Sequence, residues 1–148
     1  MGLLMKYFNK PSFKDWQLRI ISATLKSKNT LVVTPTGSGK SLCYQFPAVV
    51  TGKLTVVLMP NISLIMDQVH HLQGSGLRIT HLGTMQTDHN IITKIAQDDY
   101  HIVFCTPESF YDNLGESKPI FKSLAVQNRI GLIAIDEAHL LKAWRTFR

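Results

Sequence analysis

Apolar and polar residues along the chain follow two different periods. Short apolar runs rich in β-branched residues alternate with longer segments in which the apolar residues recur every three or four positions. Runs of this length that are apolar throughout are typical of strands buried on both faces of a parallel sheet. The pattern therefore predicts strands over residues 31–33, 54–58, 102–104 and 130–135, and a weaker one over 77–81.

The segments between these runs have helical spacing. Residues 13–26, 61–72 and 88–96 each carry apolar side chains along one stripe, and Ser12 is the expected N-cap of the first helix. Such alternation of strands and helices, with right-handed crossovers, indicates an α/β fold: a doubly wound, mostly parallel sheet with helices on both faces. Because these sheets bind ligands at the carboxyl ends of their strands, the residues after each strand are the first candidates for a site.

Length and composition narrow the class of protein. The chain has 148 residues, 45% hydrophobic and 18% charged, which suits one folded domain and argues against disorder. No apolar stretch approaches the ~20 residues of a membrane span, so we expect a soluble intracellular protein. Cys43 and Cys105 suffice for neither a structural zinc site nor a disulfide scaffold, and we expect both to be buried apolar residues. The net charge of +6 suits a partner that carries phosphates.

The first candidate site follows the first expected strand. Two glycines allow a tight turn whose N–H groups point inward at phosphate oxygens, and the next helix adds the positive end of its dipole. Lys40 can reach the β- and γ-phosphates of a nucleotide, and the Ser41 hydroxyl can bind Mg²⁺. The alternative is a plain glycine-rich turn with a surface lysine, and Thr34 replaces the usual first glycine. The predicted nucleotide-binding residues here are Thr36, Gly37, Ser38, Gly39, Lys40 and Ser41.

The second candidate site is an acidic pair directly after the run 130–135. A carboxylate at the mouth of a buried strand is costly unless it is hydrogen-bonded or binds a cation. We expect Asp136 to hold Mg²⁺ from the side opposite Ser41, and Glu137 to orient and deprotonate the water that attacks the γ-phosphorus. The alternative is a helix N-terminus in which Asp136 is only a cap. His139 lies directly behind the pair and is a candidate link between the nucleotide and a neighbouring element.

With both motifs in place, residues 7–148 resemble the RecQ family of DNA helicases in superfamily 2. The string Leu-Cys-Tyr-Gln-Phe-Pro-Ala at 42–48 is similar to the end of the family's motif I and is far more specific than the phosphate loop alone. Similar matches exist to motif Ia at 59–69, motif Ib at 106–108 and motif 0 at 13–17. The resemblance implies a RecA-like P-loop NTPase fold with ATP and Mg²⁺ as cofactors. Within the family, residues 46–53 and 82–86 are similar to the Werner-type branch.

The resemblance also assigns residues outside the two motifs. Gln17 would read the adenine edge, which an amide can do because it both donates and accepts, and Lys14 would assist near the nucleotide. Without the resemblance, Gln17 would be read as a solvated helix residue. Two loops at strand ends would bind DNA phosphates, and an aromatic-rich loop would couple DNA binding to ATP hydrolysis. The residues expected to bind DNA or to couple it to ATP are Pro60, Ser63, Thr106, Pro107, His139, Trp144, Phe147 and Arg148.

The resemblance covers one lobe of a two-lobed motor. Residues 1–148 match the first RecA-like domain from motif 0 to the start of the aromatic-rich loop, which has one residue fewer than is usual, and no second lobe follows. We expect the chain alone to bind nucleotide and DNA but not to unwind DNA. Joined to a second lobe, it would act as a 3′–5′ helicase on single-stranded or partly duplex DNA in repair or recombination, in a nucleus or a bacterial nucleoid. The alternatives are another superfamily 2 helicase that acts on RNA, and a catalytically silent nucleotide- or DNA-binding module.

Overall fold

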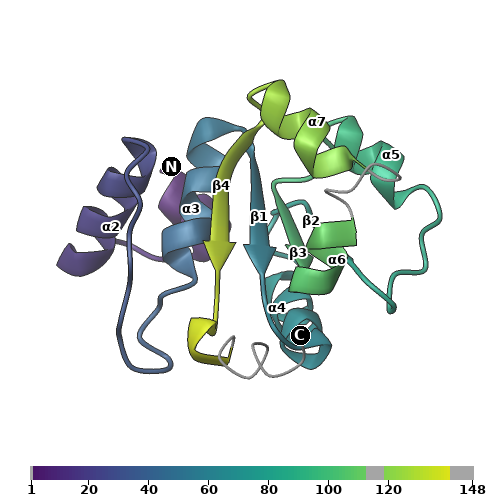
Figure 1. Ribbon diagram of the computed structural model, residues 1–148. Coiled ribbons are helices and arrows are strands. Elements are labelled where there is room, and N and C mark those ends of the chain that lie inside the picture. The colour runs from purple at the N-terminus through teal and green to yellow at the C-terminus, as the bar shows by residue number, and fades with distance from the viewer. Residues whose placement is uncertain (1, 113–118, 141–148) are drawn as a thin grey trace.

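The computed structural model describes residues 2–112 and 119–140. Strands and helices alternate along the chain as the sequence predicts, after two N-terminal helices (Figure 1). The elements in chain order are α1 (Leu3–Phe8), α2 (Asp15–Leu25), α3 (Leu42–Thr51), β1 (Leu54–Leu58), α4 (Ile62–Leu72), β2 (Ile79–Leu82), α5 (Ile91–Ala96), β3 (Ile102–Cys105), α6 (Pro107–Asp112), α7 (Ile120–Val126) and β4 (Ile130–Ile135).

The four strands form one sheet in the order β2-β3-β1-β4, and every pairing is parallel. Leu58, at the end of β1, is in register with Cys105 on one side and Ile135 on the other. The carboxyl ends of the three strands therefore lie at one edge of the sheet, where the candidate residues of three different loops meet.

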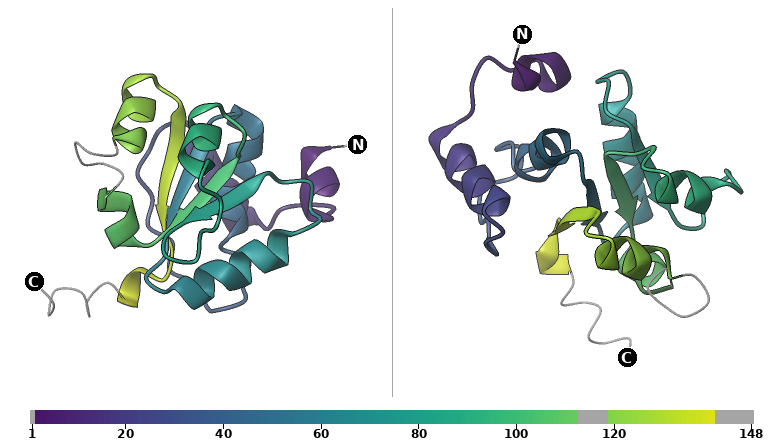
Figure 2. Two further views of the ribbon diagram at one scale, coloured as in Figure 1. Left: turned by 90° about the vertical axis from the view of Figure 1, so that its right-hand side faces the viewer. Right: turned by 90° about the horizontal axis from the view of Figure 1, so that it is seen from above.

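Helices cover both faces of the sheet (Figures 1 and 2), which confirms the predicted α/β architecture. One apolar cluster joins Val56 and Val103 to side chains of α5 and α7, among them the fully buried Phe121. The other joins Val57 and Phe104 to side chains of α3 and α4. Neighbouring residues of β1 thus contribute to opposite clusters, because successive side chains of a strand point to opposite faces.

The strand predicted over 31–33 is wrong. This segment has no regular secondary structure and belongs to the long dark blue loop between α2 and α3 in Figure 1. Leu31 and Val33 are 83% and 84% exposed. An apolar, β-branched run favours a strand only where a neighbouring backbone pairs with it, and such pairing is not encoded locally.

β4 was predicted as a fully buried strand, and this too needs correction. It forms the edge of the sheet, and its side chains alternate between half-buried and exposed, with Ile133 and Ile135 49% and 53% exposed. Within the described ranges, no helix combines the length and apolar character needed to cross a bilayer.

Candidate nucleotide site

The phosphate loop lies between residue 34 and the start of α3. Gly37 and Gly39 have φ angles of +76° and +96°, in the left-handed region that favours glycine. Ser41 occupies the N-cap position of α3, so the helix begins at Leu42. The loop is therefore turned tightly just before a helix N-terminus, as a phosphate site requires.

Gly39 is also in close contact with α2. A side chain there would place its Cβ 2.8 Å from Gln17 Nε2, closer than real Cβ contacts come. Gln17 donates to the Gly39 carbonyl at 2.9 Å, and Lys14 Nζ donates to the Ser38 carbonyl at 2.9 Å. Two side chains from the start of α2 thus hold consecutive carbonyls of the phosphate loop.

The start of α2 differs from the prediction at its cap. The N-cap is Lys14 and not Ser12, and the helix begins at Asp15. Gln17 Oε1 accepts a hydrogen bond from the Lys14 N–H at 2.9 Å. The Gln17 side chain thus satisfies a backbone donor that a Ser12 N-cap was expected to satisfy. Gln17 is 3% exposed and is therefore not a solvated helix residue.

Thr34 closes the loop at its other end. Its hydroxyl is 2.8 Å from the Ser38 hydroxyl, and its carbonyl accepts a hydrogen bond from Lys40 Nζ at 3.1 Å. This accounts for the position where the sequence departs from the usual loop: the threonine side chain spans the turn. The Lys40 ammonium lies over the loop and is half-buried.

The acidic pair lies at the end of β4. The Asp136 N–H donates to the Leu58 carbonyl at 2.9 Å, which joins the residue to the end of β1. Glu137 has a φ of +53°, which is rare for a residue with a side chain, and its N–H donates to Asp136 Oδ1 at 2.9 Å. Glu137 also lies next to His139, whose Nε2 is 3.4 Å from Glu137 Oε2.

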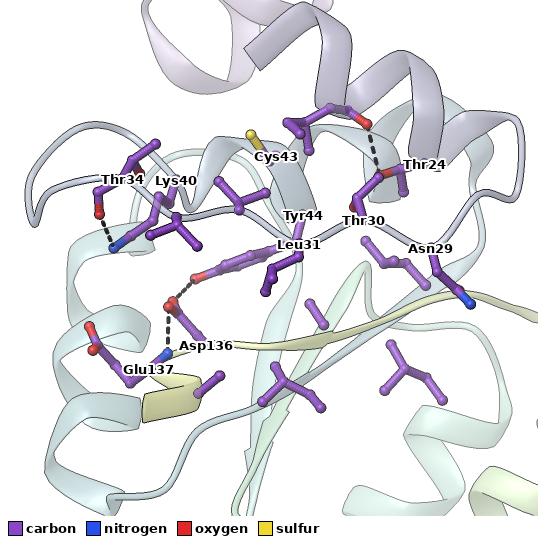
Figure 3. A pocket seen from close by; sticks show the side chains of 18 of the residues that line it. Thr24, Asn29, Thr30, Leu31, Thr34, Lys40, Cys43, Tyr44, Asp136 and Glu137 are labelled. Atoms are coloured by element: carbon purple, nitrogen blue, oxygen red, sulfur yellow. Dashed lines mark hydrogen bonds between the residues drawn. The ribbon is translucent and has the colours of Figure 1, made fainter. Parts of the chain in front are cut away.

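A single cavity of about 590 Å³ brings the phosphate loop and the acidic pair together (Figure 3). Thr34 and Lys40 line one side of it, and Asp136, Glu137 and His139 line the other. Residues 29–33 and the second half of β4 also line it. Two motifs 96 positions apart in the sequence, at 40 and 136, thus face one volume.

Tyr44 is a site residue that the sequence analysis missed. Its hydroxyl donates to Asp136 Oδ2 at 3.0 Å across the cavity (Figure 3). Burial is the main cause that raises the pKa of the Tyr44 phenol far above its usual value, and the Asp136 charge raises it further. The sequence places Tyr44 three residues after Ser41, on the same side of a helix, but does not show that its hydroxyl reaches Asp136. Cys43, which also lines the cavity, is a buried thiol whose pKa burial raises to about 11.

The donor atoms present suit Mg²⁺. Ser41 and Asp136 offer oxygen ligands, and Mg²⁺ in nucleotide sites is commonly held by one or two such side chains together with phosphate oxygens and water. In residues 2–112 and 119–140, no three His, Cys, Asp or Glu side chains gather as a metal site of their own. The arrangement fits a metal that arrives with a phosphorylated ligand.

The candidate DNA residues lie at the same edge of the sheet. Pro60 and Ser63 follow β1, and Thr106 follows β3, which is bonded to β1 through Met59 N–H and the Cys105 carbonyl at 3.0 Å. Ser63 is exposed, and its N–H donates to Asn61 Oδ1 at 2.7 Å. Pro107 is buried in the first turn of α6, so its side chain is not available to a ligand. Trp144, Phe147 and Arg148 lie outside the described residues.

A model of the DEAD/DEAH box helicase family matches residues 14–148. The chain belongs to this family. Among curated relatives, it is similar to the mouse (Mus musculus) bifunctional 3′-5′ exonuclease/ATP-dependent helicase WRN, with 38% identity over 145 residues that cover 97% of this chain and 10% of the relative. It is also similar to the ATP-dependent DNA helicase RecQ of Haemophilus influenzae, with 35% identity over 147 residues that cover 97% of this chain and 23% of the relative.

The similarity to a helicase named RecQ agrees with the resemblance that the motifs predicted. The chain spans about a tenth of the length of the first relative and under a quarter of that of the second. Among solved structures, a hypothetical ATP-dependent RNA helicase from Sulfolobus tokodaii matches with a TM-score of 0.70 and 22% identity, over 97% of this chain and 42% of that one. That likeness supports the fold: an α/β, RecA-like helicase domain.

Proposed function

We propose that this chain is the ATP-binding lobe of a RecQ-like 3′–5′ DNA helicase, in which ATP hydrolysis drives movement along DNA. The observation that carries the proposal is the common cavity of Lys40, Asp136 and Glu137. A glycine-rich turn before a helix, a lysine and two carboxylates are the groups that phosphoryl transfer needs on one lobe of a motor.

Each residue has a distinct role in this proposal. Lys40 leaves the Thr34 carbonyl and binds the β- and γ-phosphates, while loop N–H groups hold the remaining oxygens. Ser41 and Asp136 hold Mg²⁺, which neutralises charge on the phosphates when bound. Glu137 accepts the proton of the attacking water, and its contact with His139 orients the carboxylate.

Gln17 and Lys14 act at the adenine side of the loop in this proposal. The amide of Gln17 already accepts from Lys14 N–H and donates to the Gly39 carbonyl. Its oxygen keeps one lone pair and its nitrogen keeps one N–H, and an adenine edge would reach this pair once the side chain, 3% exposed in the unliganded chain, turns outward. Recognition of the base and the shape of the phosphate loop would then depend on one side chain.

Titration with a fluorescent ATP analogue tests the nucleotide site. We expect saturable binding that Mg²⁺ strengthens, because the metal joins the phosphates to Ser41 and Asp136. The measurement is fluorescence anisotropy at increasing chain concentration, with excess Mg²⁺ or with EDTA. Absence of saturable binding, or binding that Mg²⁺ leaves unchanged, would contradict the proposal.

DNA is proposed to cross the loops after β1 and β3, with its phosphates held by backbone N–H groups and hydroxyls. Ser63 and Thr106 supply hydroxyls there, and the net charge of the chain is +6. Contacts of this kind fix the position of a strand without reading its bases.

Binding of single-stranded DNA should fall steeply with salt. Each phosphate contact contributes about −0.7 to the slope of log affinity against log salt, so about three contacts predict a loss of roughly tenfold to twentyfold between 50 and 200 mM salt. The measurement is anisotropy of labelled oligonucleotides, DNA and RNA of the same sequence. Equal affinity at both salt concentrations would exclude phosphate-dominated binding, and a clear preference for RNA would favour an RNA helicase lobe.

A matched pair of variants locates the contact. Ser63→Glu places a negative charge at the proposed DNA edge and should weaken binding. Ser22→Glu makes the same change on the exposed side of α2 and should have little effect. Equal losses in the two variants would indicate a response to net charge alone.

A further inference from the structure

Tyr44 lies close in the chain to Ser41 and is bonded to Asp136, the two residues that we assign to Mg²⁺. Its hydroxyl donates to Asp136 Oδ2 at 3.0 Å. Tyr44 follows Ser41 by three residues in the first turn of α3, where its N–H donates to the Ser41 carbonyl at 3.2 Å. Tyr44 therefore links the first turn of α3, directly after the phosphate loop, to Asp136 at the acidic end of the cavity.

The Asp136 carboxylate is held at both of its oxygens. Oδ2 accepts from Tyr44, and Oδ1 accepts the Glu137 N–H at 2.9 Å. Two hydrogen bonds to different oxygens fix the plane of the carboxylate. Each oxygen keeps further acceptor capacity for a metal ion or for its water.

Both partners of the Tyr44–Asp136 bond are anchored to the end of β1. Tyr44 is 7% exposed and belongs to the cluster that contains Ala48 and Val57. Asp136 is bonded through its N–H to the carbonyl of Leu58, the residue next to Val57. The donor, on α3, and the acceptor, after β4, are thus both held against β1, since α3 packs on this strand and Asp136 is bonded to its end.

Tyr44 is the hydrogen-bond donor in this contact, because a carboxylate offers only acceptors. Its bond to Asp136 is charge-assisted, a class that is stronger than hydrogen bonds between neutral groups.

We infer that Tyr44 is a positioning residue for the metal site: its hydroxyl holds the Asp136 carboxylate, beside Ser41, in the orientation that binds Mg²⁺ next to the nucleotide phosphates. The inference rests on the proposed function. Tyr44 acts through Asp136, so its contribution should be visible in the binding of the metal and not in that of the nucleotide alone. Groups that orient metal ligands in this way commonly change metal affinity by ten- to a hundredfold when removed.

The variant Tyr44→Phe tests the inference because it keeps the ring and removes only the hydroxyl. With the fluorescent ATP analogue at a fixed concentration, we expect the Mg²⁺ concentration at half-saturation to rise roughly tenfold. Affinity for the analogue in EDTA should remain that of the unmodified chain. Tyr111→Phe is the matched control, since Tyr111 is 61% exposed on α6, and it should change neither value.

A second experiment combines Tyr44→Phe with Asp136→Asn. If Tyr44 acts through Asp136, adding Tyr44→Phe to Asp136→Asn should raise the Mg²⁺ requirement no further than Asp136→Asn alone. An unchanged Mg²⁺ requirement in Tyr44→Phe, or equal losses with Mg²⁺ and with EDTA, would overturn the inference while leaving the proposed function intact. If the unmodified chain shows no Mg²⁺-dependent binding, the proposed function fails and the inference fails with it.

Discussion

Lys40→Ala should weaken binding of an ATP analogue by roughly ten- to a hundredfold, because hydrogen bonds to charged groups contribute about 1.5–3 kcal/mol. In the unliganded chain, the Lys40 ammonium is bonded to the Thr34 carbonyl and lines the cavity opposite Asp136. One hydrogen bond in a half-buried position is a small contribution to folding. The variant should therefore remain folded, which circular dichroism would check beside the anisotropy titration.

Lys28→Ala is the control for Lys40→Ala. Lys28 lines the same cavity but is exposed and lies outside the phosphate loop. Both substitutions lower the net charge from +6 to +5, that is, 6 − 1 = 5. We expect Lys28→Ala to bind the analogue as the unmodified chain does. If Lys40→Ala left binding unchanged, or if both variants lost the same amount, the phosphate-loop assignment would be wrong.

Phe104→Ala should destabilise the fold by about 3–5 kcal/mol, the usual cost of removing a fully buried aromatic ring. Phe104 is 0% exposed at the centre of β3 and packs with the cluster that also contains Tyr44 and Val57. Domains of this size are stable by only about 5–15 kcal/mol in total, so the variant should be close to unfolding. Urea unfolding followed by circular dichroism measures the change.

Val126→Ala is the comparison for Phe104→Ala. Val126 is 82% exposed at the end of α7, and its truncation should change the free energy of unfolding by less than about 0.5 kcal/mol. A Phe104→Ala midpoint close to that of Val126→Ala would show that the described core does not hold the sheet together.

The parallel sheet could be predicted because β1 and β3 are buried on both faces and therefore read as continuous apolar runs. Residues 31–33 have the same composition but lie beside the sheet without pairing. Local sequence cannot distinguish the two cases, since a strand is completed by the hydrogen bonds of a distant neighbour. β4 was found for the same reason as β1, but its exposed alternation follows from its place at the edge, which sequence does not specify.

In the candidate site too, some residues could be predicted from the local sequence and others only from the fold. The glycines and Lys40 were predictable because the chemistry of phosphate binding requires those residue types at fixed spacing. Tyr44 was not, because inside an apolar string it reads as a core residue, and only the fold brings its hydroxyl to Asp136, 92 positions away. The cap of α2 failed similarly: Gln17 serves both Lys14 and the phosphate loop, a contact that a local capping rule does not contain.

β1 has a mechanical consequence for any motor built on this lobe. Its end is bonded on one side to Asp136 and on the other, through Met59, to Cys105 at the end of β3. The acidic pair and the proposed DNA loops are thus joined to the end of one strand. A nucleotide and a DNA strand bound at these residues would therefore move together with the sheet. A step along DNA would then require a separate part of the protein to move relative to this sheet.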